Sequence, residues 1–324
     1  MPLQGQNRPC YNVKKAGRRE QTVANIIAVV WDFDKTLVDG YMQDPIFAHF
    51  NVDAESFWRE VDALPDKYKR EQHVRVNRDT IYLNHFIRYA KEGKFPGLNN
   101  QMLRQFGSKL TFYPGVPDIF EAARNVVAGE KRYTEYDIKV EHYVVSTGMR
   151  EIIRGSIVEN EVECAWGCEL IEDTDPNDRN RRIISEIGYS IDNTSKTRAL
   201  FEINKGVPQR DSMEVNTKVP EAQRRVRFEN MIYIADGPSD IPAFSLTHKN
   251  GGATFAVYPH ADFRAFRQVE QLRQEGRIDM FAEADYREGT TAYMWITQKI
   301  REYAERICRR EQAKIPQGGT PKHL

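Results

Sequence analysis

Two short apolar runs of the sequence each end at a pair of aspartates. The first run ends at Asp32 and Asp34, and the second, much later in the chain, ends at Asp236 and Asp240. Nearly continuous, β-branched runs predict strands buried on both faces of a parallel sheet. In an open parallel sheet, groups that follow the carboxyl ends of strands face one crevice, so we expect the four carboxylates to lie together.

Four carboxylates at one edge of a sheet would repel one another unless a cation lies among them. Taken alone, either aspartate pair could simply cap a turn, and only the combination points to a metal ion. The set offers oxygen ligands with no His or Cys, which favours Mg²⁺ over zinc or copper. The sequence therefore predicts a magnesium site among these four carboxylates.

A third apolar run, 143–145, ends at Ser146 and Thr147, which precede Gly148. Hydroxyls and backbone N–H groups beside a glycine can approach phosphate oxygens closely. Lys196, at the start of an apolar helical pattern, could add a positive charge to the same oxygens. Since Mg²⁺ in proteins commonly binds substrate phosphate, these groups predict a phosphorylated substrate.

Four segments, taken in this order, resemble the four motifs of the haloacid dehalogenase-like (HAD) superfamily of phosphohydrolases. They are Asp32-Phe33-Asp34-Lys35-Thr36-Leu37, Ser146, Lys196, and Asp236-Gly237-Pro238-Ser239-Asp240. The resemblance spans roughly residues 26–244 and continues compatibly through Tyr286. One departure is Ala235, where many members have Gly, and a small side chain there should still fit.

The resemblance implies a covalent route for phosphomonoester hydrolysis. Asp32 would attack phosphorus to form an aspartyl phosphate, and Asp34 would protonate the leaving oxygen and then deprotonate the attacking water. The Asp32 carboxylate, the Asp34 backbone carbonyl and the Asp236 carboxylate would hold Mg²⁺. Asp240 would orient the groups around the metal ion.

The remaining motif residues would bind the phosphoryl group or support the loops. Ser146 and Lys196 would bind phosphoryl oxygens, and Thr147 could share or take the role of Ser146. Thr36 and Gly237 are expected to support the loops that carry the reacting aspartates.

The fold class predicted around these residues is α/β, with a Rossmann-like parallel sheet flanked by helices and an inserted all-helical cap. Residues 26–40 and 111–309 would form the core, and helical spacing of apolar residues over 41–110 predicts the cap, which is similar to the C1 cap of the phosphoserine phosphatase-like branch. Residues 1–25 are expected to be a flexible basic arm, and 310–324 a flexible tail.

Composition narrows the possible partners. The chain of 324 residues has 47 Lys and Arg against 47 Asp and Glu, so no overall positive charge favours nucleic acid or a membrane surface. No stretch is apolar enough to span a membrane, and four cysteines do not form a disulfide framework. We therefore expect a soluble, cytoplasmic protein.

The sequence thus predicts a magnesium-dependent phosphatase acting on a small phosphorylated metabolite, with phosphoserine as the default suggested by the cap type. Two alternatives remain open: a catalytically idle HAD-like binding module, and a phosphotransferase to an acceptor other than water. Several cap residues could contact a substrate, namely Tyr41, Phe47, Lys69, Arg70, Arg75 and Arg78. Most of the basic ones fit a solvated helix face equally well.

Overall fold

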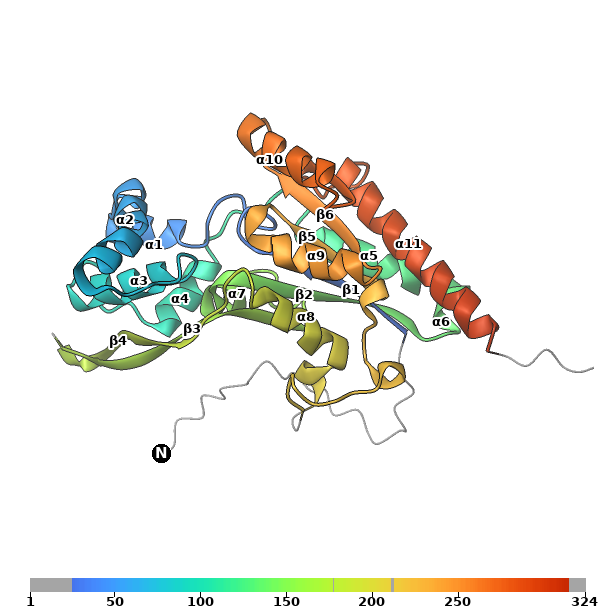
Figure 1. The fold of residues 1–324 in the computed structure, drawn as a ribbon, viewed down its shortest axis with the longest axis horizontal. Coiled ribbons are helices and arrows are strands. Elements are labelled where there is room, and N and C mark those ends of the chain that lie inside the picture. The colour runs from blue at the N-terminus through green and yellow to red at the C-terminus, as the bar shows by residue number, and fades with distance from the viewer. Residues whose placement is uncertain (1–24, 177, 211–212, 315–324) are drawn as a thin grey trace, which may run out of the picture.

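A seven-stranded sheet forms the centre of the molecule (Figure 1), in the order β4-β3-β2-β1-β5-β6-β7. The computed structural model describes residues 25–176, 178–210 and 213–314. All neighbouring strands are parallel except β3 and β4, which pair antiparallel. The strands are β1 (Asn25–Trp31), β2 (Ile138–Met149), β3 (Cys164–Asp175), β4 (Asp178–Tyr189), β5 (Met231–Ala235), β6 (Ala253–Tyr258) and β7 (Met280–Glu283). The predicted α/β, Rossmann-like class is confirmed.

The three apolar runs singled out in the sequence lie in the three central strands. They form β1, part of β2 and β5, and the side chains of β1 and β5 are almost all buried. Strand β2 is longer than its run 143–145, because Lys139 and Glu141 interrupt the apolar pattern. The Glu141 carboxylate is buried in an ion pair with Arg225, which compensates its charge inside the sheet.

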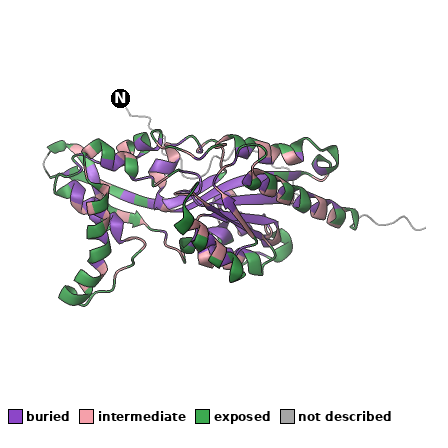
Figure 2. Ribbon diagram, turned by 90° about the horizontal axis from the view of Figure 1, so that it is seen from above, coloured by how far each residue is buried: buried purple, intermediate pink, exposed green. Residues whose placement is uncertain are grey.

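Helices cover both faces of the sheet, and Figure 2 shows the buried strands between helices whose outer sides are exposed. Helices α5 and α11 pack on each other and against β1 and β2, while α8 and α9 pack on each other. The helices of the core are α5 (Asp118–Ala128), α6 (Lys131–Thr134), α7 (Arg150–Arg154), α8 (Lys196–Lys205), α9 (Ile241–Lys249), α10 (Phe263–Gln274) and α11 (Thr291–Gln312).

Regular structure extends slightly into both of the predicted tails. Strand β1 begins at Asn25, so the rest of the expected basic arm lies outside the described residues. Helix α11 continues to Gln312, and a tail that begins at residue 310 is therefore wrong by nearly one turn. The Arg310 guanidinium anchors this last turn through an ion pair with Glu229. In the described ranges no helix is long and apolar enough to cross a membrane, and the cytoplasmic location stays a prediction.

The cap consists of four helices, α1 (Asp44–Phe50), α2 (Ala54–Gln72), α3 (Ile81–Lys91) and α4 (Asn100–Gly107). They enclose a cluster of aromatic rings built around Phe47, Phe57, Phe86 and Phe95. Asp53 caps α2 through the backbone N–H of Ser56, as its position in the sequence predicts. The cap therefore has an apolar core of its own.

The hairpin of β3 and β4 gives the cap a second attachment to the core. It extends beneath α3 and α4 (Figure 1) and contacts α3 along β4. The Ile184 N–H donates to the Leu98 carbonyl at 2.9 Å, and the Asn100 side chain donates to the Leu170 carbonyl at 2.9 Å. The sequence pattern did not predict this hairpin, because its polar residues mask the strand periodicity.

Cap helix α4 and core helix α7 approach each other closely enough to require glycine. A Cβ atom on Gly155 would clash with the backbone carbonyl of Arg104, and one on Gly107 would clash with that of Ile152. Both clashes involve backbone, which cannot rotate away as a flexible side chain can. The contact between cap and core thus depends on two glycines.

We predict that Gly155→Ala lowers the free energy of unfolding by about 2–3 kcal/mol, because one helix must move away from the other. Gly129→Ala is a matched control: Gly129 also follows a helix in a right-handed conformation, and its Cβ would come no closer than 3.1 Å to another atom. The control should change stability by less than about 1 kcal/mol. Urea denaturation measures both, and equal losses would contradict the close packing.

Candidate active site

The pairing of β1 with β5 brings two distant aspartates together. Trp31 lies opposite Ile234 in the parallel register, and the Asp32 N–H continues the pairing by donating to the Ile234 carbonyl at 2.9 Å. Asp32 and Asp236 therefore leave the same edge of the sheet. One carboxylate oxygen from each of Asp32, Asp236 and Asp240 lies within 4.8 Å of the others.

A buried lysine neutralises part of this acidic cluster. The Lys196 side chain is buried, and its Nζ donates to Asp32 Oδ1 at 2.9 Å and to Asp240 Oδ1 at 2.7 Å. Burial disfavours the charged ammonium, but the charges of Asp240 and Asp32 outweigh that effect and raise the pKa of Lys196. The lysine is therefore held protonated between two carboxylates.

Helix α8 places this lysine at its first residue. The turn before the helix is fixed by Asp192, whose Oδ1 accepts from the Ser195 N–H at 2.7 Å and whose carbonyl accepts from the Lys196 N–H at 3.1 Å. The apolar helical pattern that begins at Lys196 in the sequence forms this helix. Only the order of Lys196 among the motifs distinguished it in the sequence from an ordinary exposed lysine.

Both carboxylate oxygens of Asp240 are already used within the protein. Oδ1 accepts from Lys196 and from the Tyr233 hydroxyl, and Oδ2 accepts from the Ser239 hydroxyl at 2.7 Å. A carboxylate held in this way is better suited to orient its neighbours than to bind a metal ion directly.

The remaining carboxylate oxygens fit a divalent cation. Asp32 Oδ2 and the Asp236 carboxylate accept no hydrogen bond from any other described residue. Burial, reinforced by the charge of Asp240, raises the pKa of Asp32 and raises that of Asp236 to about 6. One lysine is thus too little positive charge for this cluster, and a hard cation with oxygen ligands such as Mg²⁺ would supply the rest.

Asp34 lies apart from the other three acids. Its Oδ1 accepts from the backbone N–H of Met42 at 2.9 Å. Burial raises the pKa of Asp34 to about 7, with the Met42 hydrogen bond opposing the shift and the charge of Asp236 adding to it. A carboxyl group with a pKa near neutrality can both donate and accept a proton.

The irregular carboxyl end of β2, residues 146–149, forms the loop that carries the predicted phosphate-binding groups. The Ser146 hydroxyl is buried and accepts from the Gly148 N–H at 3.0 Å, whereas Thr147 is only half-buried. A Cβ on Gly148 would clash with the Met42 side chain, so the glycine allows the cap to approach this loop. The Thr147 carbonyl accepts from the hydroxyl of Tyr82 in the cap at 2.8 Å.

Thr36 and Gly237, the two residues expected to support the loops, both lie in the loops that carry the reacting aspartates. The Thr36 carbonyl accepts from the Tyr286 hydroxyl at 2.6 Å, which ties the loop after β1 to the far end of the core. Gly237 has extended backbone, and a Cβ there would contact the Gln268 amide. The turn predicted at this point is a short 3₁₀ helix, Pro238–Asp240.

The basic cap residues suggested as substrate contacts are exposed. They are Lys69, Arg70, Arg75 and Arg78, and the last pairs with Asp66 at 3.9 Å. Phe47 is buried in the aromatic cluster of the cap. The exposure of the basic residues fits the solvated helix face that the sequence also allowed.

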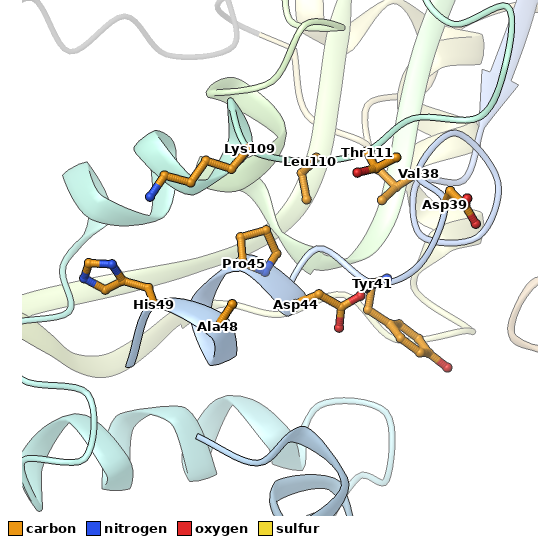
Figure 3. A pocket seen from close by; sticks show the side chains of 10 residues that line it. All are labelled: Val38, Asp39, Tyr41, Asp44, Pro45, Ala48, His49, Lys109, Leu110 and Thr111. Carbon is orange, nitrogen blue, oxygen red and sulfur yellow. Dashed lines mark hydrogen bonds between the residues drawn. The ribbon is translucent and has the colours of Figure 1, made fainter. Parts of the chain in front are cut away.

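A cleft of about 550 Å³ lies between the two segments that join cap and core (Figure 3). Tyr41 and Asp44 line it from one segment, and Lys109 and Thr111 from the other. None of the four motif aspartates lines it. It marks the hinge of the cap rather than the reacting groups.

Sequence reasoning missed three buried residues that contact the active-site loops, namely Met42, Tyr82 and Cys168. Tyr82 has the spacing of a core residue of α3, and neither sulfur side chain belongs to a recognisable motif. No local signal separates such residues from ordinary core positions.

Comparison with curated proteins finds an uncharacterized protein of Borreliella burgdorferi (strain ATCC 35210 / DSM 4680 / CIP 102532 / B31). It is 38% identical over 287 residues, covering 85% of this chain and 97% of that protein. The chain belongs to the same family as this protein. No family model matches the chain.

Solved structures with similar folds carry the names that the motifs suggested. One is an apo phosphoserine phosphatase, which is 15% identical with a TM-score of 0.49, and the match covers 82% of this chain and 97% of that chain. Another is a HAD family hydrolase from Salmonella enterica subsp. enterica serovar Typhi, which is 13% identical with a TM-score of 0.47, and the match covers 80% of this chain and 67% of that chain. A probable phosphoserine phosphatase from Vibrio cholerae is 11% identical with a TM-score of 0.48, and the match covers 88% of this chain and 69% of that chain. With TM-scores below 0.5 these matches add nothing on activity, which is left to the geometry of the site.

We predict that Lys196→Met lowers the free energy of unfolding by about 3–5 kcal/mol in the presence of EDTA, because it leaves two buried carboxylates without their cation. The loss should shrink from about pH 8 to about pH 5. The pKa of Asp32 is raised in the folded protein, and protonation at lower pH removes the repulsion. Urea denaturation at both pH values measures the effect.

Lys131→Met is the control for this substitution, since Lys131 is exposed and its nearest carboxylate lies 3.8 Å away. It should change stability by less than about 1 kcal/mol. A Lys196→Met loss that is as small, or that does not depend on pH, would contradict the role given to the buried ammonium.

Proposed function

We propose that the chain is a magnesium-dependent phosphomonoester hydrolase that acts through an aspartyl phosphate on Asp32. The observation that carries the proposal is the buried Lys196 ammonium between Asp32 and Asp240, with a carboxylate oxygen of Asp236 within 4.8 Å of theirs. The ammonium orients Asp32 and opposes the effect of burial on its pKa, and a bound cation would further favour the ionised form that a nucleophile requires.

Asp32 performs the first displacement in this proposal. One carboxylate oxygen of Asp32 forms a bond to phosphorus while the bond from phosphorus to the ester oxygen breaks. The leaving oxygen takes a proton from Asp34, whose pKa of about 7 allows it to be protonated near neutral pH. The products of this step are an alcohol and the acyl phosphate on Asp32.

Asp34 reverses its role in the second displacement. Now ionised, it accepts a proton from water as the water oxygen attacks phosphorus and the bond to Asp32 breaks. Inorganic phosphate leaves and Asp34 is protonated again. A group with a pKa near 7 serves both steps, whereas an ordinary aspartate would rarely be protonated in the first.

Asp32, Asp236 and the Asp34 backbone carbonyl would hold the Mg²⁺ ion in this proposal. The ion would offset the negative charge between the nucleophile and the phosphoryl group. Asp240 keeps Lys196 in place, and Lys196 and Ser146 contribute donors for phosphoryl oxygens. Thr147 contributes its backbone to the same loop.

The substrate in this proposal is a small phosphorylated metabolite. A cap with a packed aromatic core can close over the site and exclude water, which suits a small molecule. The exposed positions of Lys69, Arg70, Arg75 and Arg78 give no support to a charged pocket for a serine-like group. A screen of phosphorylated metabolites decides among substrates, with phosphoserine as one member.

We predict that Asp32→Asn reduces turnover of p-nitrophenyl phosphate by more than about 10³-fold, because the amide cannot act as the nucleophile. Asp62→Asn, which changes an exposed aspartate of α2, should keep wild-type turnover. Removal of metal by EDTA should abolish turnover, and added Mg²⁺ should restore it. Undiminished activity of Asp32→Asn, or activity that survives EDTA, would refute the proposal.

The same assay separates hydrolysis from the two alternatives. A wild-type protein that binds phosphate but turns over no ester of the screen would instead be a binding module. Added alcohols that divert the phosphoryl group from water would reveal a phosphotransferase. For a hydrolase, released phosphate should equal released nitrophenol at every alcohol concentration.

A further inference from the structure

Two residues of the cap hold the backbone of the phosphate-binding loop. The Tyr82 hydroxyl donates to the Thr147 carbonyl at 2.8 Å, and the Met42 sulfur accepts from the Met149 N–H at 2.9 Å. Both side chains are buried, and both come from the segment between the first and second motifs. The cap therefore touches the loop itself and does not merely cover it.

The contact made by Tyr82 fixes the orientation of one peptide group. The carbonyl of Thr147 and the N–H of Gly148 belong to the same trans peptide, so they point in opposite directions. With the carbonyl held by the cap, the N–H points the other way and reaches the Ser146 hydroxyl at 3.0 Å. Rotation of this peptide would turn the N–H away from Ser146.

We propose that Tyr82 is a positioning residue of the phosphate site, which holds the peptide between Thr147 and Gly148 so that the Gly148 N–H orients the Ser146 hydroxyl toward the phosphoryl oxygens. This inference rests on the proposed function, since it assumes that the loop binds phosphate. Tyr82 does not touch the reacting atoms in this role. It makes the geometry of the loop depend on the seating of the cap.

A second contact of the same cap segment supports this coupling. The Asn77 side chain donates to Asp192 Oδ2 at 2.8 Å, and the Asn193 N–H donates to Asp79 Oδ2 at 3.2 Å. Asp192 in turn accepts the first backbone hydrogen bond of Lys196. Residues 77–82 thus contact both loops that carry predicted phosphate-binding groups.

Asn77 lies before α3 but is not its N-cap residue, which is Thr80. The Asn77 side chain instead crosses to the core through Asp192. Asn77 thus has a local role, in which its Oδ1 accepts from the Asp79 N–H at 2.9 Å, and a tertiary role through its contact with Asp192. The tertiary contact is consistent with a cap segment shaped to contact the core.

The Cys168 side chain, which belongs to β3 of the core, also contacts the Thr147 carbonyl oxygen. Its sulfur lies 3.2 Å from the Thr147 oxygen and 3.3 Å from the Ile191 nitrogen. The thiol is a weak donor, so the Tyr82 hydroxyl is the stronger of the two partners of this carbonyl. Burial raises the pKa of Tyr82 and keeps the phenol protonated as a donor.

The test compares two conservative variants of one helix. Tyr82→Phe removes the hydroxyl that holds Thr147, and Tyr89→Phe removes a hydroxyl of α3 that donates to Glu60 inside the cap. Calorimetric titration with inorganic phosphate in the presence of Mg²⁺ gives the dissociation constant of each. We expect Tyr82→Phe to raise it about tenfold, and Tyr89→Phe to change it less than about twofold.

Equal dissociation constants for the two variants would overturn the inference, even if Tyr82→Phe unfolds at a lower temperature, because packing alone would then explain the residue. If Tyr82→Phe does not fold, Cys168→Ala takes its place and should raise the dissociation constant about threefold. An unchanged constant for that variant overturns the inference.

Turnover of p-nitrophenyl phosphate in the same samples separates this inference from the proposed function. A wild-type protein that binds phosphate without turnover refutes the hydrolase, and the dissociation constants of the variants still decide the role of Tyr82. A wild-type protein that binds no phosphate overturns both.

Discussion

Mutual repulsion among buried carboxylates is the constraint on which this structure depends. Parallel pairing of β1 and β5 places Asp32 and Asp236 at one edge of the sheet, and the chain then adds Asp240. The protein supplies one buried ammonium, that of Lys196, to this cluster. In the proposed function, a divalent cation would offset the charge that remains uncompensated and would bind the phosphate of the substrate.

The cap contacts the core at several places besides the two segments of chain that join them. The β3–β4 hairpin holds α3 and the segment before α4, and two glycines let α4 and α7 approach closely. Side chains of the cap then donate to the carboxyl end of β2 and to the loop before α8. A change in the position of the cap would therefore move the predicted phosphate-binding groups.

The acidic cluster could be predicted from the sequence because its physical causes are local. The runs that form β1 and β5 have no polar interruption, and each stops at an aspartate. The full length of β2 could not be predicted, because a charge such as Glu141 inside a strand is acceptable only with its distant partner Arg225. Tertiary ion pairs of this kind leave no local pattern.

The hairpin and the cap contacts could not be predicted for a related reason. Strand β4 carries three arginines and one glutamate because much of it is exposed, and its contact with α3 of the cap leaves no local pattern. Tyr82 has the spacing of an ordinary core residue, and its hydroxyl acquires a partner only when α3 reaches the carboxyl end of β2. Such residues are recognised from coordinates rather than from periodicity.

A crystal structure of the protein with Mg²⁺ and beryllium fluoride tests the central claim most directly, since beryllium fluoride imitates a phosphoryl group on an aspartate. The account predicts beryllium bonded to an Asp32 carboxylate oxygen, Mg²⁺ bound by Asp32 and Asp236, and Lys196 beside a fluoride. Beryllium on another residue, or a metal ion bound away from Asp236, would contradict it.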